Sequence, residues 1–420
     1  MLTDASGGVL LDVPPGWDCV PLDQLVAPSR GISYGIVQPG KHEPGGVPIV
    51  RVADVRNGQI DTHDVLRVAQ DIESTYERTR LRGGEVLLSL VGTLGECAVA
   101  SERLRGWNVA RAIGVIPLAT GTDPRWVALC LRSSAVQALM RAWATTTVQA
   151  TLNLREVRRL PILMPPEGLR ARITETVGAL DDKIEQNRRT AQALERLARA
   201  IFRAWFVDFE PVKAKVAGAT AFPSTPQPVF DALPTRFVDS AVGPVPEGWE
   251  VLRLDGLLTL QRGFDLPKQS RTDGSHPILA ASGVNGWHSE WRAKGPGVTT
   301  GRSGVLGQVY FVDRDFWPLN TSLWVKEYKR SNPWHAYFLL QTLDLAQFNA
   351  GSAVPTLNRN HVHSLPNVAP PNNLLAAFGE TCGLTFALDQ QIRAEVDKLA
   401  AMRDYLLPKL LSGQVRVEPQ

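Results

Sequence analysis

Cysteine is scarce in this chain, and long hydrophobic runs are missing. The 420 residues include four cysteines, Cys19, Cys97, Cys130 and Cys382, and no two of them form a Cys-x-x-Cys pair. This spacing argues against a disulfide framework and against a cysteine-based zinc site. No apolar run reaches 18 residues and no charged-then-apolar leader opens the sequence, so we expect no membrane span, no signal peptide and a cytoplasmic location.

The motifs of several enzyme classes are also missing. There is no Gly-x-x-x-x-Gly-Lys-Ser/Thr phosphate loop, no dinucleotide-binding fingerprint and no Asn-Pro-Pro-Tyr/Phe tetrapeptide of methyltransferases. His361 and His363 lie two residues apart, but no cysteine or carboxylate cluster completes a metal site around them. We therefore expect no catalytic residue, no metal and no cofactor on this chain.

Overall composition is that of a globular protein, with 44% hydrophobic and 21% charged residues. The net charge of +3 is unevenly distributed. Residues 27–160 contain 17 Lys or Arg against 12 Asp or Glu, and residues 259–366 contain 11 against 7. Two basic modules suit a polyanionic partner, although many globular domains reach such a charge without one.

The most informative feature is an internal repeat. The run Val13-Pro-Pro-Gly-Trp17 returns as Val245-Pro-Glu-Gly-Trp249, and Gly92, Gly95 and Asn108 return as Gly304, Gly307 and Asn320. The segment Thr151-Leu-Asn153, which we call the exit of the module, returns as Thr356-Leu-Asn358. In both copies a Leu-Pro pair and then a Pro-Pro pair follow the exit. The number of residues between a motif and its repeat shrinks from 232 at the opening to 205 at the exit, while the order of the motifs is kept. This indicates one scaffold with different insertions in its two copies.

Two long helices are predicted at equivalent places in the two halves. An a/d heptad seam is formed by Leu180, Ile184, Asn187, Ala191, Leu194, Ala198, Ile201 and Trp205, and a second by Leu388, Ile392, Leu399, Met402 and Leu406. Asn187, the polar member, most simply fixes the helix register. Pro408 should end or kink the second helix. Each helix can bury its apolar stripe against the other, so we expect an antiparallel coiled coil with one module at each end.

The predicted fold class is therefore α+β, with two pseudo-repeated α/β modules separated by two long helices. The predicted order is a first module over residues 1–166, with a short helix from Trp126 to about Trp143, a long helix over 167–210, and a Pro- and Ala-rich linker over 211–246. A second module over 247–371 and a C-terminal helix over 372–420 follow.

Together, these features resemble the specificity subunits of type I restriction-modification systems. The resemblance is carried by the two Pro-x-Gly-Trp openings, the Gly-x-x-Gly and Asn patterns, the Thr-Leu-Asn exits and the Leu-Asp-x-x-Ile helix segments at Leu180 and Leu388. It implies a DNA-binding, non-catalytic subunit whose two target recognition domains each read half of a gapped target in double-stranded DNA, with the helices fixing the gap. A helix of about 30 residues spans roughly 45 Å, equivalent to about 13 base pairs.

The resemblance also implies partner proteins. Two modification (methyltransferase) subunits would bind S-adenosylmethionine, and restriction (translocase/nuclease) subunits that use ATP and Mg would join them. The helix seams would serve the coiled coil and the partner interface. Two other interpretations are considered: a duplicated adaptor that binds proteins through two modules on a coiled-coil spacer, and a fragment of a fused restriction-modification enzyme. Salt-insensitive binding would favour the adaptor, and the missing enzyme motifs argue against the fragment.

Candidate DNA-contacting residues are chosen for charge, glycine-rich context and position next to the repeated exits. They are Arg51, Arg56, Thr146, Thr147, Gln149, Arg155, Arg158 and Arg159 in the first module, and Lys268, Gln269, Arg271, Thr300, Arg302, Ser303, Ser352 and Arg359 in the second.

Each candidate group has a plainer interpretation. Arg302 suits a guanine edge or a phosphate, but it equally suits a solvated turn. The run from Lys268 to Arg271 is more readily a solvated loop than a groove contact, and Thr and Gln side chains also cap helices. Arg155, Arg158 and Arg159 look like phosphate contacts rather than base contacts. The repeated Trp17 and Trp249 are interpreted as core residues.

Overall fold

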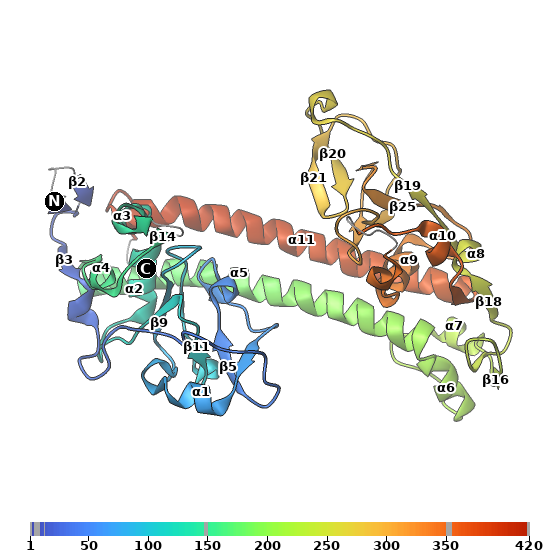
Figure 1. The fold of residues 1–420 in the computed structure, drawn as a ribbon, viewed down its shortest axis with the longest axis horizontal. Helices are drawn as coiled ribbons and strands as arrows, with labels where there is room; N and C mark the ends of the chain where they lie inside the picture. Colours follow the sequence, from blue (N-terminus) through green and yellow to red (C-terminus); the bar gives the residue numbers. More distant parts are fainter. Residues whose placement is uncertain (1, 4–8, 12, 147–149, 350–354, 418–420) are drawn as a thin grey trace. The chain divides into compact units, whose positions relative to one another are not determined.

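The chain folds into two compact units that are both mixtures of helix and sheet. The computed structural model describes residues 2–3, 9–11, 13–146, 150–349 and 355–417. Unit 1 contains Met1–Arg189 and Arg393–Gln420, and unit 2 contains Thr190–Ile392. Helices account for 41% and strands for 24% of the structure, as the predicted fold class requires. Each unit combines one predicted module with parts of both long helices (Figure 1).

Unit 1 is built on two small sheets. A four-stranded sheet has the order β10-β9-β12-β4 and a three-stranded sheet the order β11-β5-β8. Every side chain of β9 and β12 is buried, which explains why these segments are nearly continuous apolar runs. The strands are β4 (Ser33–Tyr34), β5 (Val47–Val50), β8 (Leu66–Val68), β9 (Val86–Ser89), β10 (Cys97–Val99), β11 (Asn108–Val109) and β12 (Ile113–Ile116).

Shorter elements complete this unit. The opening and the exit of the module pair directly, because β3 (Asp18–Pro21) runs antiparallel to β15 (Pro161–Met164). The other strands are β1 (Leu2–Thr3), β2 (Val9–Leu11), β6 (Val55–Arg56), β7 (Gln59–Ile60), β13 (Thr145–Thr146) and β14 (Ala150–Thr151). The helices of the module are α1 (Gln70–Ser74), α2 (Pro124–Arg132), α3 (Ser134–Trp143) and α4 (Leu154–Arg158).

One predicted helix of unit 1 is in fact two. The sequence predicted a single short helix from Trp126 to about Trp143, but Ser133 interrupts it. Ser133 has extended backbone angles, and its side chain accepts a hydrogen bond from the backbone N–H of Val136. It therefore caps α3, as serine commonly does at a helix start.

Unit 2 repeats the topology of unit 1. Its four-stranded sheet has the order β19-β25-β22-β23 and its three-stranded sheet the order β21-β20-β24. In chain order, β19 to β25 correspond one to one with β4, β5 and β8 to β12. The strands are β19 (Leu258–Arg262), β20 (His276–Ala280), β21 (Gly283–His288), β22 (Gly297–Gly301), β23 (Val309–Val312), β24 (Trp317–Pro318) and β25 (Ser322–Tyr328).

The pairing directions repeat as well. One pair in each three-stranded sheet is parallel, β11 with β5 and β24 with β20, while the other pairs of both sheets are antiparallel. The opening strand β18 (Glu250–Arg253) pairs with the exit strand β26 (Pro366–Ala369), just as β3 pairs with β15. The helices α8 (Leu254–Leu257), α9 (Pro333–Thr342) and α10 (Arg359–His363) complete the module. The internal repeat seen in the sequence is therefore a repeat of topology.

Residues 211–246 are more structured than a linker. The sequence showed no periodicity there, yet the segment contains α6 (Glu210–Val216), α7 (Gln227–Asp231) and the strand pair β16 (Phe237–Val238) with β17 (Val245–Pro246). Phe230 is 1% exposed and belongs to the aromatic core that also includes Phe202 and Phe378. A few buried side chains hold this segment in place. Its helices are too short to give a hydrophobic repeat that can be recognised in the sequence.

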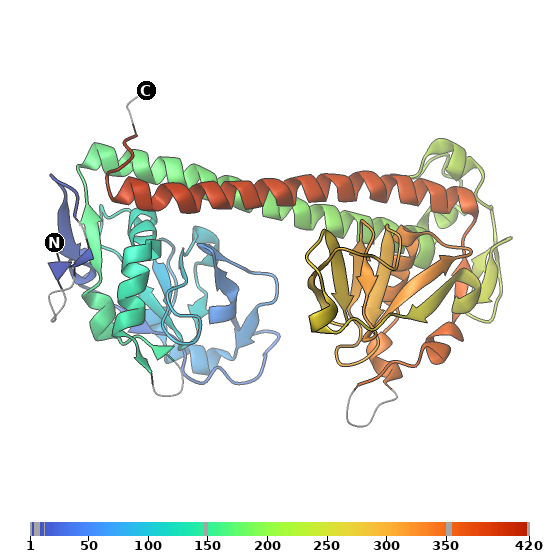
Figure 2. The ribbon, with the colours of Figure 1, turned by 90° about the horizontal axis from the view of Figure 1, so that it is seen from above.

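The two long helices pack against each other antiparallel within each unit. They are α5 (Glu167–Phe202), which continues as a π-helical turn over Arg203–Val207, and α11 (Asn372–Leu411). In unit 1 the first turns of α5 meet the end of the chain, where Arg172 Nε donates to the Val417 carbonyl at 3.2 Å. In unit 2 the end of α5 meets the start of α11, where the rings of Phe202 and Phe378 are 5.9 Å apart. Figures 1 and 2 both show α5, in green, beside α11, in red.

The positions of the seam predicted for α5 are buried or half-buried. Ile184, Asn187, Ile201 and Trp205 are each less than a tenth exposed, and Leu180 and Leu194 are half-buried. Residues four and three apart return to the same face of a helix, so this face is the one that packs.

The seam predicted for α11 needs a correction. Ile392 is buried and Leu399 and Leu406 are half-buried, but Leu388 is 45% and Met402 52% exposed. The positions on the packed face are instead the next residues, Asp389 and Arg403, the latter 6% exposed. Choosing apolar residues shifted the prediction by one position. Pro408 does not end the helix, which continues to Leu411.

Candidate nucleic-acid interface

In each module, the structure brings the glycine-rich loop to the Thr-Leu-Asn exit. Val91 forms a bridge with Thr151 in unit 1, and Ser303 forms the equivalent bridge with Thr356 in unit 2. We call this junction the loop edge of the module: residues 91–95 with 145–146 and 150–155 in unit 1, and residues 302–307 with 349 and 355–359 in unit 2. Figure 2 shows each loop edge on the side of its module away from α5 and α11.

The glycines of these loops repeat for a conformational reason. Gly92 and Gly95 have φ of 81° and 89°, and Gly304 and Gly307 have φ of 92° and 84°. L-residues with side chains rarely adopt such angles, whereas glycine does so at little cost. Each pair turns the chain back toward the exit segment, so the two distant motifs of each half form one surface.

The loop edge of unit 2 gathers three of its candidate residues. Arg302 is half-buried and its Nη1 donates to the carbonyl of Asn320 at 3.2 Å, while Ser303 is half-buried and Arg359 is exposed on α10. Thr300 is fully buried, and its hydroxyl donates to the Gln308 carbonyl at 2.7 Å. Thr300 therefore supports the sheet and is not part of the exposed surface. Ser352 lies outside the described residues.

The loop edge of unit 1 gathers a different set. Thr145 and Arg155 are exposed at this edge, and the backbone of Thr146 pairs with that of Ala150. The β6–β7 hairpin also reaches it, because the backbone N–H of Asn57 donates to the Glu96 carboxylate at 2.8 Å. This contact brings the exposed Arg56 close to the glycine loop. Thr147 and Gln149 lie outside the described residues.

Three other arginines of unit 1 are held by neighbours. Arg51 donates to both carboxylate oxygens of Asp54, at 3.0 and 2.9 Å, and the hydrogen bond to Asp54 raises the pKa of Arg51. Arg158 pairs with Asp23 at 3.4 Å, and the Arg159 guanidinium lies 5.5 Å from the ring centre of Trp143. Arg158 and Arg159 remain exposed at the surface, whereas the guanidinium of Arg51 is hydrogen-bonded to the Asp54 carboxylate.

The polar run Lys268, Gln269 and Arg271 lies apart from the loop edge. It starts with a single turn of 3-10 helix and then follows the outer strand β21. Lys268 and Gln269 are exposed, while Arg271 Nη1 donates to the carbonyl and the side-chain oxygen of Asn285, at 2.8 and 3.0 Å.

Comparison with known proteins points to one family. No family model matches the chain. It is 26% identical over 154 residues to the EcoBI type I restriction enzyme specificity subunit of Escherichia coli, covering 36% of this chain and 32% of that one. It is 23% identical over 331 residues to the HindI specificity subunit of Haemophilus influenzae, covering 63% and 71%. The MjaIX specificity subunit of Methanocaldococcus jannaschii is 25% identical over 293 residues, covering 63% and 62%.

A solved structure agrees in fold along nearly the whole chain. The S subunit of a type I restriction-modification system from M. genitalium superposes with a TM-score of 0.58 at 14% identity, covering 98% of this chain and 99% of that one. The chain resembles the type I specificity subunits in sequence and in fold. The resemblance inferred from the repeated motifs is thereby confirmed.

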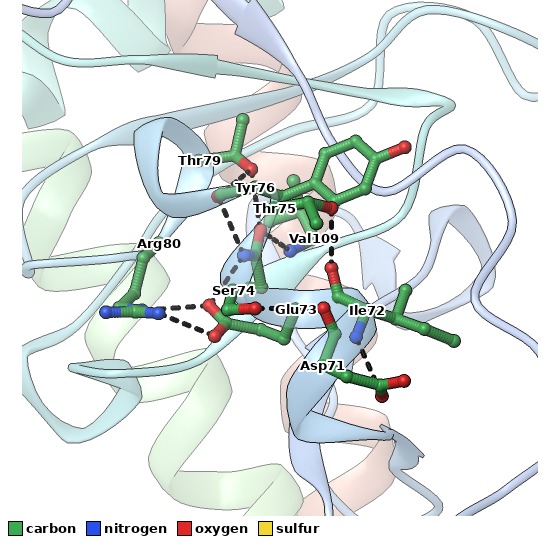
Figure 3. A network of polar contacts seen from close by, with 10 residues as sticks. Asp71, Ile72, Glu73, Ser74, Thr75, Tyr76, Thr79, Arg80 and Val109 are labelled. Carbon is green, nitrogen blue, oxygen red and sulfur yellow. Dashed lines mark hydrogen bonds and ion pairs between the residues drawn. The ribbon is translucent and has the colours of Figure 1, made fainter.

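The Asn that repeats after each glycine loop has a role in this fold that sequence reasoning did not assign. The Asn108 side-chain amide donates to the Glu73 carboxylate at 2.9 Å. Arg80 donates to both oxygens of that carboxylate, at 2.8 and 2.6 Å, as Figure 3 shows. Glu73 is fully buried, and the hydrogen bond from Arg80 lowers its pKa. In unit 2 the amide of Asn320 donates to the Asp265 carboxylate. The repeated amide therefore anchors a carboxylate in both modules.

A second network that the sequence did not reveal joins the first module to both long helices. Asp181 of α5 accepts from Arg132 of α2 at 2.8 Å and from Arg403 of α11 at 3.0 Å. The exposed fractions of these side chains are 15%, 15% and 7%. We call this arrangement the Asp181 junction. In the sequence, Asp181 is the aspartate of the repeated Leu-Asp-x-x-Ile segment at Leu180, next to the heptad seam of α5.

Metal binding receives no support from the described part of the chain, which contains no group of three or more His, Cys, Asp or Glu side chains placed to hold an ion. His363 Nε2 accepts from the backbone N–H of Leu260 at 2.9 Å, and burial lowers its pKa. Among the described residues, no helix is long and apolar enough to cross a membrane.

Proposed function

We propose that this chain is the sequence-specific DNA-binding subunit of a type I restriction-modification complex and reads a two-part, gapped target. The observation that carries the proposal is the duplicated module, with one strand order used twice and each copy packed on the same pair of helices. A protein that reads two half-sites needs two readers of one design on a fixed spacer. The similarity to type I specificity subunits supports the same role.

Differences between the loop edges support two different half-sites. The unit 1 edge presents Thr145, Arg56 and Arg155, whereas the unit 2 edge presents Arg302 and Arg359. Arginine can donate two hydrogen bonds to guanine, and threonine can hydrogen-bond base edges or contact the methyl group of thymine. Modules with the same strand order but different side chains at the same edge would therefore prefer different base sequences.

The proposed partners are two modification subunits and the restriction subunits of the same complex. S-adenosylmethionine, ATP and Mg would be held by these partners, and this chain would direct their methylation or cleavage without catalysing it. Exposed apolar residues along α11 support a protein interface: Leu384, Leu388, Met402 and Tyr405 are 72%, 45%, 52% and 63% exposed. Burying such side chains against a partner is favourable.

Genome-wide mapping of adenine methylation tests the proposal. Cells that express this chain with its neighbouring modification subunit are compared with cells that lack only this chain. We expect a gapped, two-part motif that appears only when the chain is present. Complexes that assemble but leave no new methylation would contradict the proposal and favour a protein-binding adaptor.

A module swap then tests the independence of the two readers. Residues 27–160 are exchanged for the corresponding module of a related subunit, and methylation is mapped again. Only one half of the motif should change. A change in both halves would show that the modules do not read independently.

A further inference from the structure

A row of polar and aromatic side chains crosses the four-stranded sheet of unit 2. Gln261 of β19 lies opposite Trp324 of β25, which lies opposite Thr299 of β22. Thr299 in turn lies opposite Tyr310 of β23. Residues that lie directly opposite each other on paired strands point to the same face of a sheet. We call Gln261, Trp324, Thr299 and Tyr310 the cross-strand row.

The cross-strand row faces the three-stranded sheet of the same module. Trp324 and Tyr310 both pack against a cluster that includes Leu279 of β20. The Tyr310 ring also lies against the start of β21, because a Cβ added at Gly283 would be 3.1 Å from it. Thr299 is 1% exposed, and burial raises the pKa of Tyr310. The row therefore lies in the layer between the two sheets.

The same layer of unit 1 is apolar. Leu87 and Thr299 each lie five residues before the first glycine of the repeated loop, so they occupy equivalent positions. Leu87 lies opposite Val115 on one side and Ala98 on the other, as Thr299 lies opposite Trp324 and Tyr310. The three residues of unit 1 are buried in one hydrophobic cluster. The second module has thus placed a hydroxyl and an indole N–H where the first has hydrocarbon.

Polar atoms in this layer of unit 2 are left without partners. Among the described residues, Thr299 Oγ1 and Trp324 Nε1 have no hydrogen-bond partner, although both atoms are buried. The same holds for Nε1 of Trp317, on β24 of the facing sheet. The rings of Trp317 and Trp324 both contact Phe264, with centres 6.4 Å apart in each case. Buried polar groups of native proteins are nearly always hydrogen-bonded to protein or to ordered water.

We propose that the second module holds ordered water between its two sheets, with one molecule bridging Thr299 Oγ1 and Trp324 Nε1. Side chains that lie directly opposite each other have Cβ atoms about 4.5–5.5 Å apart, so one water can reach both polar atoms. The indole only donates, whereas the hydroxyl donates and accepts, so the water accepts from Trp324 and bonds with Thr299 in either sense. The inference goes beyond the proposed function and does not depend on it.

Nuclear magnetic resonance of the full chain, with isotope-labelled tryptophan, tests the water site directly. The indole N–H signal of Trp324, identified by its loss in Trp324→Phe, should show a nuclear Overhauser effect to water. Thr299→Val removes the hydroxyl and nearly keeps the side-chain shape, so the effect should be lost in this variant. The indole of Trp126 is the control in the same sample. Its Nε1 donates to the Leu163 carbonyl at 2.7 Å and should show no contact with water.

The sign of a stability change separates a hydrated layer from a dry one. With water in place, Thr299→Val leaves the water and Trp324 short of a partner, and the melting temperature should fall by about 2–4 °C. In a dry layer the same substitution would remove an unpaired hydroxyl and raise the melting temperature. Thr300→Val is the matched control, because the Thr300 hydroxyl donates to the Gln308 carbonyl at 2.7 Å. This variant should also lose stability but should keep the water contact of Trp324.

Three results would overturn the inference. They are a wild-type Trp324 indole without a water contact, a contact that persists in Thr299→Val, and a higher melting temperature for Thr299→Val. Thr299→Ser covers the case in which the valine variant does not fold. It keeps the hydroxyl and should keep the water contact, and loss of that contact in a folded Thr299→Ser chain would also count against the bridge. Each of these results leaves the proposed function standing.

Discussion

Removing the carboxylate of Asp181 should destabilise unit 1 far more than removing the neighbouring carboxylate. Asp181→Asn keeps the side-chain shape but leaves Arg132 and Arg403 as cations without their shared carboxylate, at sites that are 15% and 7% exposed. Asp182→Asn is the matched control. Asp182 also links α5 to α2, through Arg125 at 3.1 Å, but these two side chains are 62% and 56% exposed.

The expected magnitudes follow from burial. Breaking a buried ion pair costs about 3–5 kcal/mol. Because the side chains of the Asp181 junction keep some exposure, we expect the lower end, about 3 kcal/mol, for Asp181→Asn. Water and salt screen the exposed pair, so Asp182→Asn should cost at most about 0.5 kcal/mol. For a unit of this size, the melting temperature should fall by roughly 6–12 °C in the first case and by no more than about 2 °C in the second.

The assay combines thermal unfolding of the full chain with hydrogen exchange followed on peptides of α2. Exchange of these peptides reports on the first module directly, since Trp126 of α2 is anchored by its Nε1 donating to the Leu163 carbonyl at 2.7 Å. Faster exchange in α2 should accompany Asp181→Asn and not Asp182→Asn. A triple variant with Asp181→Leu, Arg132→Met and Arg403→Met should regain most of the stability, because no cation is then left buried. Equal losses for Asp181→Asn and Asp182→Asn would refute this reasoning.

Three further predictions concern backbone space, thiols and acid. Gly304→Ala should lower the free energy of unfolding by about 1 kcal/mol, because alanine is strained in a left-handed backbone. Gly301→Ala should prevent the second module from folding, because the added Cβ would lie 1.8 Å from a backbone carbonyl oxygen. Equal melting temperatures of the two variants would contradict this. Burial raises the pKa of Cys97 and Cys130 to about 12, so at about pH 8 their thiols should react with a disulfide reagent only in denaturant. Burial lowers the pKa of His335 from 6.5 to about 3. Between these two values the unfolded chain binds a proton that the folded chain does not. The free energy of unfolding should therefore fall by up to about 1.4 kcal/mol for each unit by which the pH is lowered in this range. Urea denaturation at about pH 7 and pH 5 should show this dependence in the wild type and not in His335→Gln.

The repeated landmarks were predictive because they are set by local backbone chemistry. A Gly-x-x-Gly turn with φ above +80° accepts little except glycine, so Gly92 and Gly304 remain visible in sequence while the residues around them differ. The seam of α5 was predictable for a similar reason, since apolar side chains at steps of four and three identify its packed face. The similarity to type I specificity subunits followed from the order of such local signals.

Candidate contacts were harder to predict, because a residue type does not reveal its partner. Thr300 and Arg302 lie two residues apart, yet one is fully buried under the Gln308 carbonyl and the other reaches the loop edge. Arg51 and Arg56 look alike in sequence, but only Arg51 is held by Asp54. The end of strand β22 at Gly301 decides the first case, and the position of a carboxylate decides the second.

By itself, the sequence determined the duplication, the two long helices and the absence of familiar catalytic motifs, since each depends on residues close together or on a repeating pattern. Only the tertiary structure decided which face of α11 packs. Asp389 and Arg403 occupy the packed face while Leu388 and Met402 face solvent, and no local rule predicts this. The physical reason is that a buried cation is tolerated only where a carboxylate meets it. Arg403 meets two such carboxylates, that of its neighbour Asp404 at 2.8 Å and that of Asp181 at 3.0 Å, and Asp181 lies 222 residues away in the chain.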